Sequence, residues 1–318
     1  MLSRRTALVA AALAAVVGLS ACSGSSSASA PKADPLASVS VTAGSATKAP
    51  TVAFAKTPFT VTKTVSKVLT EGTGAPLTST DLVSINAVIV NGADGKVVTS
   101  TWDATPVGLD LGASDLFPSL KNTLPGTKVG STVLIASPPD DAFGTSGNSS
   151  LGIGGTDSVV FVVEVRSTAT ALPSAQGTAV APKKGLPKVT MNDGKAATIT
   201  MPKGVKPPKK LVVQPLIKGN GAVVKTGETV RVTYTGVLWR NGEVFDASAQ
   251  HADQPFFEFP AGEHQVISGW DKAIVGATVG SRLLLVVPPS EGYGATGSPP
   301  KIKGTDTLVF VVDILASY

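Results

Sequence analysis

The sequence predicts an α+β fold, in which two tandem domains each pack one short helix against an antiparallel sheet. Two observations carry this prediction. A long segment of the chain recurs after about 150 residues. The apolar segments of each copy are short and bounded by Gly and Pro, as is typical of strands. We expect the domains to span residues 57–168 and 205–318, each of ordinary size for a single core.

The internal repeat is the clearest sign of domain organisation. Residues 156–164 (TDSVVFVVE) match residues 305–313 (TDTLVFVVD) at an offset of 149. Residues 138–144 (PPDDAFG) match residues 288–294 (PPSEGYG) at an offset of 150. A period this long disfavours a solenoid, whose repeats span about 20–50 residues.

The second copy consists mostly of segments with strand patterns. Apolar residues alternate with polar ones over 230–234, which predicts a half-buried strand. Asn241-Gly242 is a turn signal and predicts a hairpin. Residues 257–259 form a short strand with both phenylalanine rings on one face, and 308–315 form the last strand.

The helix and the loop after the next strand predict a binding site. Trp270 lies on a short amphipathic helix that Ser268 can cap and Gly276 can end. A buried strand over 282–287 follows, and Tyr293 then stands between two glycines in a loop. A large ring with a phenol at its rim makes a shallow apolar cup. Such a cup can hold the apolar side chain of a bound residue, and the phenol can donate a hydrogen bond to the carbonyl of that residue.

Residues 1–22 predict a secretion signal that ends at a lipidation site. Arg4 and Arg5 precede an apolar run over 7–19 that is too short for a comfortable membrane span. The run ends in Leu-Ser-Ala-Cys22, which resembles a bacterial lipoprotein signal, and Cys22 is the only cysteine. We expect a lipid anchor that holds the protein at the extracytoplasmic face of the cell membrane. The alternative is an ordinary signal peptide with an incidental cysteine.

Two further segments have the composition of flexible chain. Residues 23–56 are rich in Ser, Ala, Thr, Gly and Pro, and we expect a disordered tether. Residues 169–204 predict a Lys/Pro-rich linker, and the stretch 181–210 holds eight lysines and one aspartate. The net charge of the whole chain is only +5, so its basic character belongs to this linker and does not indicate nucleic-acid binding. Contact of the linker with anionic lipid or a cell-wall polymer is the alternative to a solvated linker.

Several classes of chemistry are disfavoured by the sequence. Residues 292–297 (GYGATG) fit the letters of a dinucleotide-binding loop, but Pro299 and Pro300 follow where a helix would have to begin. The two histidines, His251 and His264, lie in polar loops without a nucleophile-elbow pattern. No cluster of metal ligands is evident, and we expect neither a metal nor another cofactor.

The second copy resembles the FKBP-type peptidyl-prolyl isomerases. The resemblance rests on residues 232–236 (VTYTG), 242–246 (GEVFD), 257–259 (FEF), 266–270 (VISGW), 280–282 (GSR), 293–297 (YGATG) and 308–310 (LVF). It implies a five- to six-stranded antiparallel sheet wrapped around the short helix. It also implies that proline-containing polypeptides are substrates and that macrolides of the FKBP-ligand type are a further ligand class.

The resemblance also implies a pocket. Trp270 would be its floor, and the Ile267 N–H and the Tyr293 hydroxyl would hold substrate carbonyls. The remaining pocket residues would be Tyr234, Phe245, Asp246, Phe257, Val266, Ile302 and Phe310. The sequence departs from better-studied members in two loops. Residues 251–255 lack an arginine, and Ser298 and Lys301 replace a histidine and an isoleucine near the rim.

The first copy keeps the strand pattern and lacks the pocket side chains. Asn86 is expected in place of Tyr234, Val98 of Phe245, Thr99 of Asp246, Leu120 of Trp270 and Phe143 of Tyr293. We interpret it as a degenerate FKBP-like domain. The whole chain is then expected to be a lipid-anchored prolyl isomerase that assists the folding of exported proteins. The rival hypothesis is a peptide-binding holdase or macrolide receptor with little turnover.

Replacing Cys22 tests the anchor. Cys22→Ala should remove the lipid and leave the protein either uncleaved or released, as measured by metabolic lipid labelling and by the mass of the mature chain. Identical labelling and mass for the two proteins would show that Cys22 is incidental.

Overall fold

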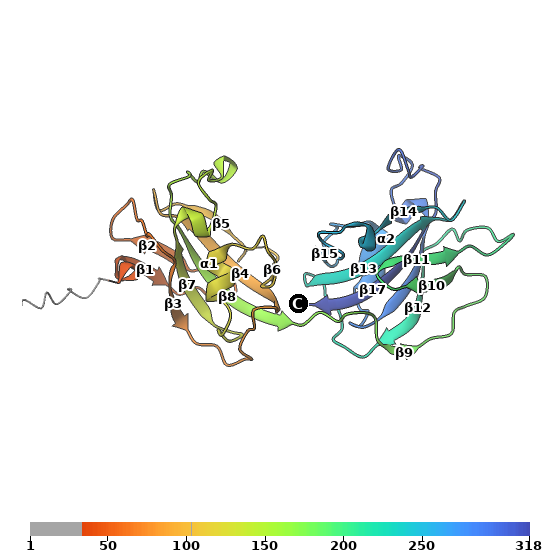
Figure 1. Ribbon diagram of the computed structural model, residues 1–318, viewed down its shortest axis with the longest axis horizontal. Helices are drawn as coiled ribbons and strands as arrows, with labels where there is room; N and C mark the ends of the chain where they lie inside the picture. The colour runs from red at the N-terminus through yellow and green to blue at the C-terminus, as the bar shows by residue number, and fades with distance from the viewer. Residues whose placement is uncertain (1–33, 103) are drawn as a thin grey trace, which may run out of the picture. The chain divides into compact units, whose positions relative to one another are not determined.

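A computed structural model describes residues 34–102 and 104–318, and it shows two domains of the expected α+β class (Figure 1). The signal segment and Cys22 lie outside the described residues. Within the described part of the chain, no helix has the length and apolar character needed to cross a membrane.

The first domain has a six-stranded antiparallel sheet in the order β3-β7-β8-β4-β5, with β6 also paired to β4. Its strands are β3 (Val65–Thr70), β4 (Leu82–Asn91), β5 (Val97–Ser100), β6 (Val107–Asp110), β7 (Thr132–Ser137) and β8 (Val159–Ala169). Its helical elements are α1 (Pro118–Thr123) and the 3-10 turns η2 (Pro139–Asp141) and η3 (Ser149–Leu151).

The second domain repeats this plan with one strand more, in the order β14-β13-β17-β16-β12-β9, with β15 paired to β13. Its strands are β9 (Gly177–Ala179), β12 (Val212–Gly219), β13 (Thr229–Leu238), β14 (Val244–Ala247), β15 (Phe257–Pro260), β16 (Arg282–Val287) and β17 (Leu308–Ser317). Its helical elements are α2 (Ser268–Ile274) and the 3-10 turns η4 (Ser248–Gln250) and η5 (Pro289–Glu291).

The predicted elements of the second copy are present. β16 has the predicted bounds, and β17 extends the predicted last strand by two residues. Gly242 has a positive φ in the turn between β13 and β14, and Gly276 has one immediately after Val275, the residue that caps the C-terminus of α2. Both conformations favour glycine because it has no Cβ to clash with the backbone.

The central strands of the second domain are buried on both faces. All eight residues of β17 from Leu308 to Leu315 are buried, and so is β16 from Leu283 onward. One face belongs to a core with α2, which includes Ile274, Leu285 and Phe310. The other face belongs to a second apolar cluster, which includes Leu284 and Val309. Two covered faces explain why these strands are continuous apolar runs and do not alternate with polar residues.

The predicted linker supplies the cover of this second face, so the interpretation of residues 169–204 as a simple linker is wrong. β9 pairs with β12, and a hairpin forms from β10 (Lys188–Asn192) and β11 (Lys195–Thr200). Ala197 and Ile199 of β11 are buried in the cluster with Leu284. All eight lysines of residues 181–210 are exposed, so the polar composition of the segment hid the few apolar residues that pack.

The first domain is covered in the same way, so the prediction of a disordered tether is wrong for residues 35–54. They form the 3-10 turn η1 (Pro35–Ser38) and a hairpin of β1 (Val39–Thr42) and β2 (Thr51–Phe54). Val41, Val52 and Phe54 pack with Val160 and Val162 of β8. A two-stranded hairpin is marginal alone, and packing on a sheet stabilises it.

Shortening Ile199 tests whether the β10–β11 hairpin belongs to the domain. Ile199→Ala should lower the free energy of unfolding by about 2–4 kcal/mol, because it leaves a cavity in a packed cluster. Urea denaturation of the full chain measures this. Thr200→Ala, at an exposed position of the same strand, is the matched control and should change the free energy of unfolding by less than about 0.5 kcal/mol. Equal effects of the two variants would show that the hairpin is not packed.

Candidate functional site

An aromatic cavity of about 470 Å³ opens on the α2 side of the second sheet. Trp270 of α2 is 4% exposed and lies at the centre of the surrounding rings. Its ring centroid is 5.3 Å from that of Tyr234 and 5.3 Å from that of Phe310, both in edge-to-face geometry. Phe257 packs edge-on at 6.3 Å. The cavity is lined by Tyr234, Phe245, Asp246, Phe257, Gln265, Val266, Ile267, Trp270, Tyr293 and Phe310.

The structure thus brings together all but one of the predicted pocket residues. The exception is Ile302, which is buried in the domain core and does not line the cavity. Gln265 lines the cavity and was not predicted. No periodic or aromatic signal marks it, and only its position directly before Val266 could have suggested it.

Helix α2 is fixed by its neighbours and not by a cap. Ser268 was predicted to cap the helix, but the cap position is Ile267 and no side chain caps it. Ser268 already lies inside the helix, and its hydroxyl donates to Glu291 of η5. Asp271 accepts hydrogen bonds from the N–H groups of Gly262 and His264 at 3.0 and 3.1 Å. These bonds attach the helix to the loop before it and orient Trp270.

The same contacts place Tyr293. Glu291 forms an ion pair with Lys272 of α2 at 2.7 Å, which ties the η5 loop to the helix. Tyr293 follows two residues later, is 42% exposed and lines the cavity. Partial burial, and then the negative charge of Asp246, raise the pKa of its phenol. Tyr293 is therefore a neutral hydrogen-bond donor at physiological pH.

Three donors at the cavity have no partner within the described residues: the buried Nε1 of Trp270 at its floor, and the Tyr293 hydroxyl and the Ile267 backbone N–H at its edge. A buried donor without a partner is costly, whereas a donor at the edge of an open cavity can bind a ligand. The Tyr293 hydroxyl and the Ile267 N–H, at the edge, can therefore donate to the carbonyls of a bound chain.

The polar edge of the cavity is a short hydrogen-bond chain. The Tyr234 hydroxyl donates to Oδ2 of Asp246, and Nε2 of His251 lies 2.9 Å from Oδ1 of the same carboxylate. Burial alone would raise the pKa of Asp246, but the hydrogen bonds from Tyr234 and His251 outweigh it and lower that pKa. Burial, and then the Asp246 hydrogen bond, raise the pKa of Tyr234. The pair is thus a carboxylate and a neutral phenol.

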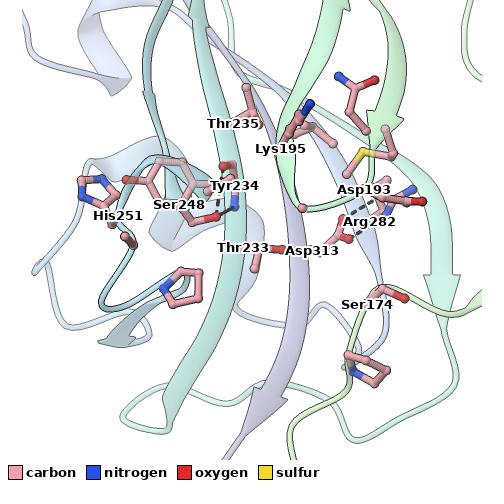
Figure 2. Close-up of a pocket in the computed structure, with 18 residues that line it drawn as sticks. Ser174, Asp193, Lys195, Thr233, Tyr234, Thr235, Ser248, His251, Arg282 and Asp313 are labelled. Carbon is pink, nitrogen blue, oxygen red and sulfur yellow. Dashed lines mark hydrogen bonds and ion pairs between the residues drawn. The ribbon is translucent and has the colours of Figure 1, made fainter.

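Backbone contacts hold this chain in place. Ser248 of η4 accepts a hydrogen bond from the Tyr234 N–H at 3.1 Å and donates to the Tyr234 carbonyl at 3.3 Å (Figure 2). Lys301, at a position where the sequence departs from better-studied relatives, donates from Nζ to the Phe245 carbonyl at 2.7 Å. Strands β13 and β14 are thereby locked on both sides of Asp246.

Gly236 explains how two phenylalanine rings fit behind the cavity. Phe245 and Phe310 pack edge-to-face with centroids 5.5 Å apart. A Cβ at Gly236 would lie 2.6 Å from the Phe245 ring and 2.9 Å from the Phe310 ring. Only glycine leaves room there, which gives this glycine a role that the sequence pattern did not reveal.

The corresponding region of the first domain is occupied by its own side chains. Phe143 packs on Phe117 at a centroid distance of 4.9 Å, and Phe117 packs on Phe161 at 6.1 Å. Leu120 is buried in the same cluster. Phe143, Phe117, Phe161 and Leu120 take the places of Tyr293, Ile267, Phe310 and Trp270, and they make apolar contacts with one another there.

One equivalence predicted for the first domain is wrong by one residue. Ala87 pairs with Val163 as Tyr234 pairs with Val312, so Ala87 and not Asn86 takes the place of Tyr234. A one-residue shift moves a side chain to the other face of a strand. Asn86 therefore lies on the far face, where it donates to Glu164. The strand register also places Thr99 at the position of Asp246.

Comparison with known proteins shows a family match to both domains. Residues 74–166 and 221–315 match the model of the FKBP-type peptidyl-prolyl cis-trans isomerase family. An FK506-binding protein of Streptomyces anulatus is 41% identical over 114 residues, which are 36% of this chain and 90% of that protein. FK506-binding protein 2 of Dictyostelium discoideum is 38% identical over 121 residues, 37% of this chain and 89% of that protein.

Two further matches differ in how much of each chain they cover. The 46 kDa FK506-binding nuclear protein of Spodoptera frugiperda is 44% identical over 102 residues, 32% of this chain but only 24% of that protein. Among solved structures, the three FKBP domains of wheat FKBP73 are 25% identical, with a TM-score of 0.32 and coverage of 80% of this chain and 94% of that one.

Replacing the floor of the cavity tests its function. Trp270→Leu gives the second domain the residue found in the first. It should lower the rate at which the protein isomerises a proline peptide by about tenfold or more, because the edge-to-face ring contacts are lost. Trp239→Leu, a matched loss of a buried tryptophan in the outer cluster, should lower stability without a comparable effect on turnover. Circular dichroism confirms folding of both. Equal turnover of the folded Trp270→Leu variant and the wild type would exclude Trp270 from the site.

Proposed function

This chain belongs to the FKBP-type peptidyl-prolyl cis-trans isomerases, and from this premise we propose that its second domain catalyses the isomerisation of X–Pro bonds. The observation that carries the proposal is the cavity with Trp270 as its floor and Asp246, Tyr293 and the Ile267 N–H at its edge. The cavity provides an apolar surface for a proline ring and donors for the flanking carbonyls.

The chemistry requires no acid–base group or cofactor. The X–Pro amide rotates over a barrier of about 18–20 kcal/mol because its C–N bond has partial double-bond character. Uncatalysed exchange takes tens to hundreds of seconds. The planar amide is more charge-separated than the twisted amide, so removal from water destabilises the planar state relative to the twisted one. Each ~1.4 kcal/mol of this difference is a factor of ten in rate.

In this mechanism the residues have distinct roles. Trp270, Phe245 and Phe310 surround the proline ring with apolar surface. The Ile267 N–H and the Tyr293 hydroxyl bind carbonyls of the flanking residues and fix the direction of the chain. Tyr234 and Asp246 hold each other in place, so that the phenol ring stays a wall of the cavity.

The cellular setting is part of the proposal. The Leu-Ser-Ala-Cys22 ending of the N-terminal apolar segment supports lipid anchoring at the extracytoplasmic face of a cell membrane. Exported polypeptides with rate-limiting X–Pro bonds would be the substrates there. The names of several relatives describe FK506 binding, and we propose the same cavity as the site for a macrolide of this kind.

Separating the domains tests where catalysis resides. Residues 169–318 should accelerate refolding limited by an X–Pro bond, whereas residues 35–168 should give less than about a tenth of that acceleration per mole. The reason is that the first domain has Leu120 in place of Trp270 and Phe143 in place of the hydrogen-bond donor Tyr293. Both side chains also pack in the apolar cluster of that domain. Both fragments include the hairpin that covers their outer sheet face.

The control for this comparison is residues 169–318 with Trp270→Leu, which should behave like the first domain. Similar acceleration by both wild-type fragments would show that the cavity residues do not carry the activity. Binding of a proline peptide without acceleration by residues 169–318 would favour the holdase hypothesis.

A further inference from the structure

His251 contacts the cavity through a carboxylate. It follows η4, and its Nε2 lies 2.9 Å from Oδ1 of Asp246, while Oδ2 of Asp246 accepts from Tyr234. Asp246 and Tyr234 line the cavity, whereas His251 lies beside it. The side chains of His251 and Asp246 are 56% and 39% exposed, so both reach solvent at the entrance of the cavity.

The other charged groups near His251 are balanced among themselves. His251 borders an outer cavity of about 360 Å³, whose charged lining consists of Asp193, Lys195, Arg282 and Asp313. Arg282 and Asp313 neutralise each other through two bonds of 2.7 Å. Asp193 and Lys195 are opposite charges on one turn. Figure 2 shows His251 beside the Tyr234 ring, with these four residues on the other side of β13.

Two further groups complete the surroundings. Asp253 lies in the same loop as His251 and borders a groove with it. Tyr293 faces Asp246 across the cavity as a neutral phenol. Within the described residues, Asp246 is the one recorded partner of the His251 side chain. A change in the charge of His251 therefore acts first on Asp246.

We propose that His251 determines specificity, because its protonation state sets the net charge at the entrance of the isomerase cavity. This inference rests on the proposed function. When the imidazole is charged, His251 and Asp246 form a neutral pair. When it is neutral, it still donates from Nε2, but the carboxylate charge is uncompensated. The cavity then favours polypeptides with a basic side chain beside the proline and disfavours those with an acidic one.

The electrostatic interaction expected at the cavity entrance is strong enough for a moderate preference between basic and acidic polypeptides. Imidazole side chains change charge between about pH 5 and 8, whereas Asp246 stays ionised over that range because its pKa is lowered. A side chain next to a bound proline lies within the ~8–10 Å over which salt leaves charges interacting. At such distances near a protein surface, one unit of charge changes the ratio of the affinities for a basic and an acidic peptide by about three- to tenfold.

The test measures turnover of two proline peptides that differ only in Lys or Glu immediately before the proline. Full-length protein is assayed by NMR exchange from pH 5.5 to 8.5 at constant ionic strength. The ratio of kcat/KM for the Lys peptide to that for the Glu peptide should rise about three- to tenfold with pH. The rise should shrink as NaCl is added.

Substitutions at both histidines define the origin of the effect. His251→Arg, which is always charged, should hold the ratio at the low-pH value of the wild type at every pH. His251→Gln, a neutral donor, should hold it at the high-pH value. His264→Asn is the matched control, because His264 lies outside the cavity with φ of 57°, which Asn tolerates, and it should keep the wild-type profile.

The outcomes separate the two proposals. An Ala-Pro peptide serves as the neutral reference. If the protein accelerates it but the Lys/Glu ratio is independent of pH, or if the pH dependence survives in His251→Gln, the role of His251 is wrong and the isomerase function stands. If the Ala-Pro peptide is not accelerated at any pH, both proposals are wrong.

Discussion

Strands β16 and β17 carry apolar side chains on both faces, and this double burial constrains the rest of the second domain. A sheet of this kind is stable only when both of its faces are covered. Helix α2 covers one face and the β10–β11 hairpin covers the other. The helix has only seven residues and cannot cover its whole face. The aromatic side chains of β13, β14 and β17 around Trp270 therefore surround an open cavity and not a closed core.

The cavity combines two environments that suit a prolyl isomerase. Its interior is formed by aromatic rings in edge-to-face contact, which exclude water without offering charge. Its edge carries one ionised carboxylate, Asp246, held between a phenol and an imidazole. In the mechanism that we propose, the interior acts on the amide and the edge acts on the flanking residues, so substitutions could change rate and substrate preference separately.

The two domains separate what the fold needs from what the site needs. Both have a sheet with a helix on one face and a hairpin on the other. Only the second has an indole on the helix and a phenol in the η5 loop. In the first domain, Phe117 packs on Phe143 and on Phe161 at the corresponding place. The fold is therefore kept although the side chains that form the cavity are not.

The sequence by itself determined the duplication and the α+β class, because strand periods and turn residues are local signals. Local signals also pointed to Trp270 and Tyr293, and the resemblance to a known family supplied the other predicted cavity residues. The strand register decided that Ala87, and not Asn86, corresponds to Tyr234, since pairing depends on hydrogen bonds between distant segments. Tertiary packing decided that the segments taken for a tether and a linker form hairpins, because a few buried residues such as Ile199 outweigh a polar composition. It also placed Ile302 in the core and His251 against Asp246, two facts that depend on how loops fold back in space and that no spacing along the chain encodes.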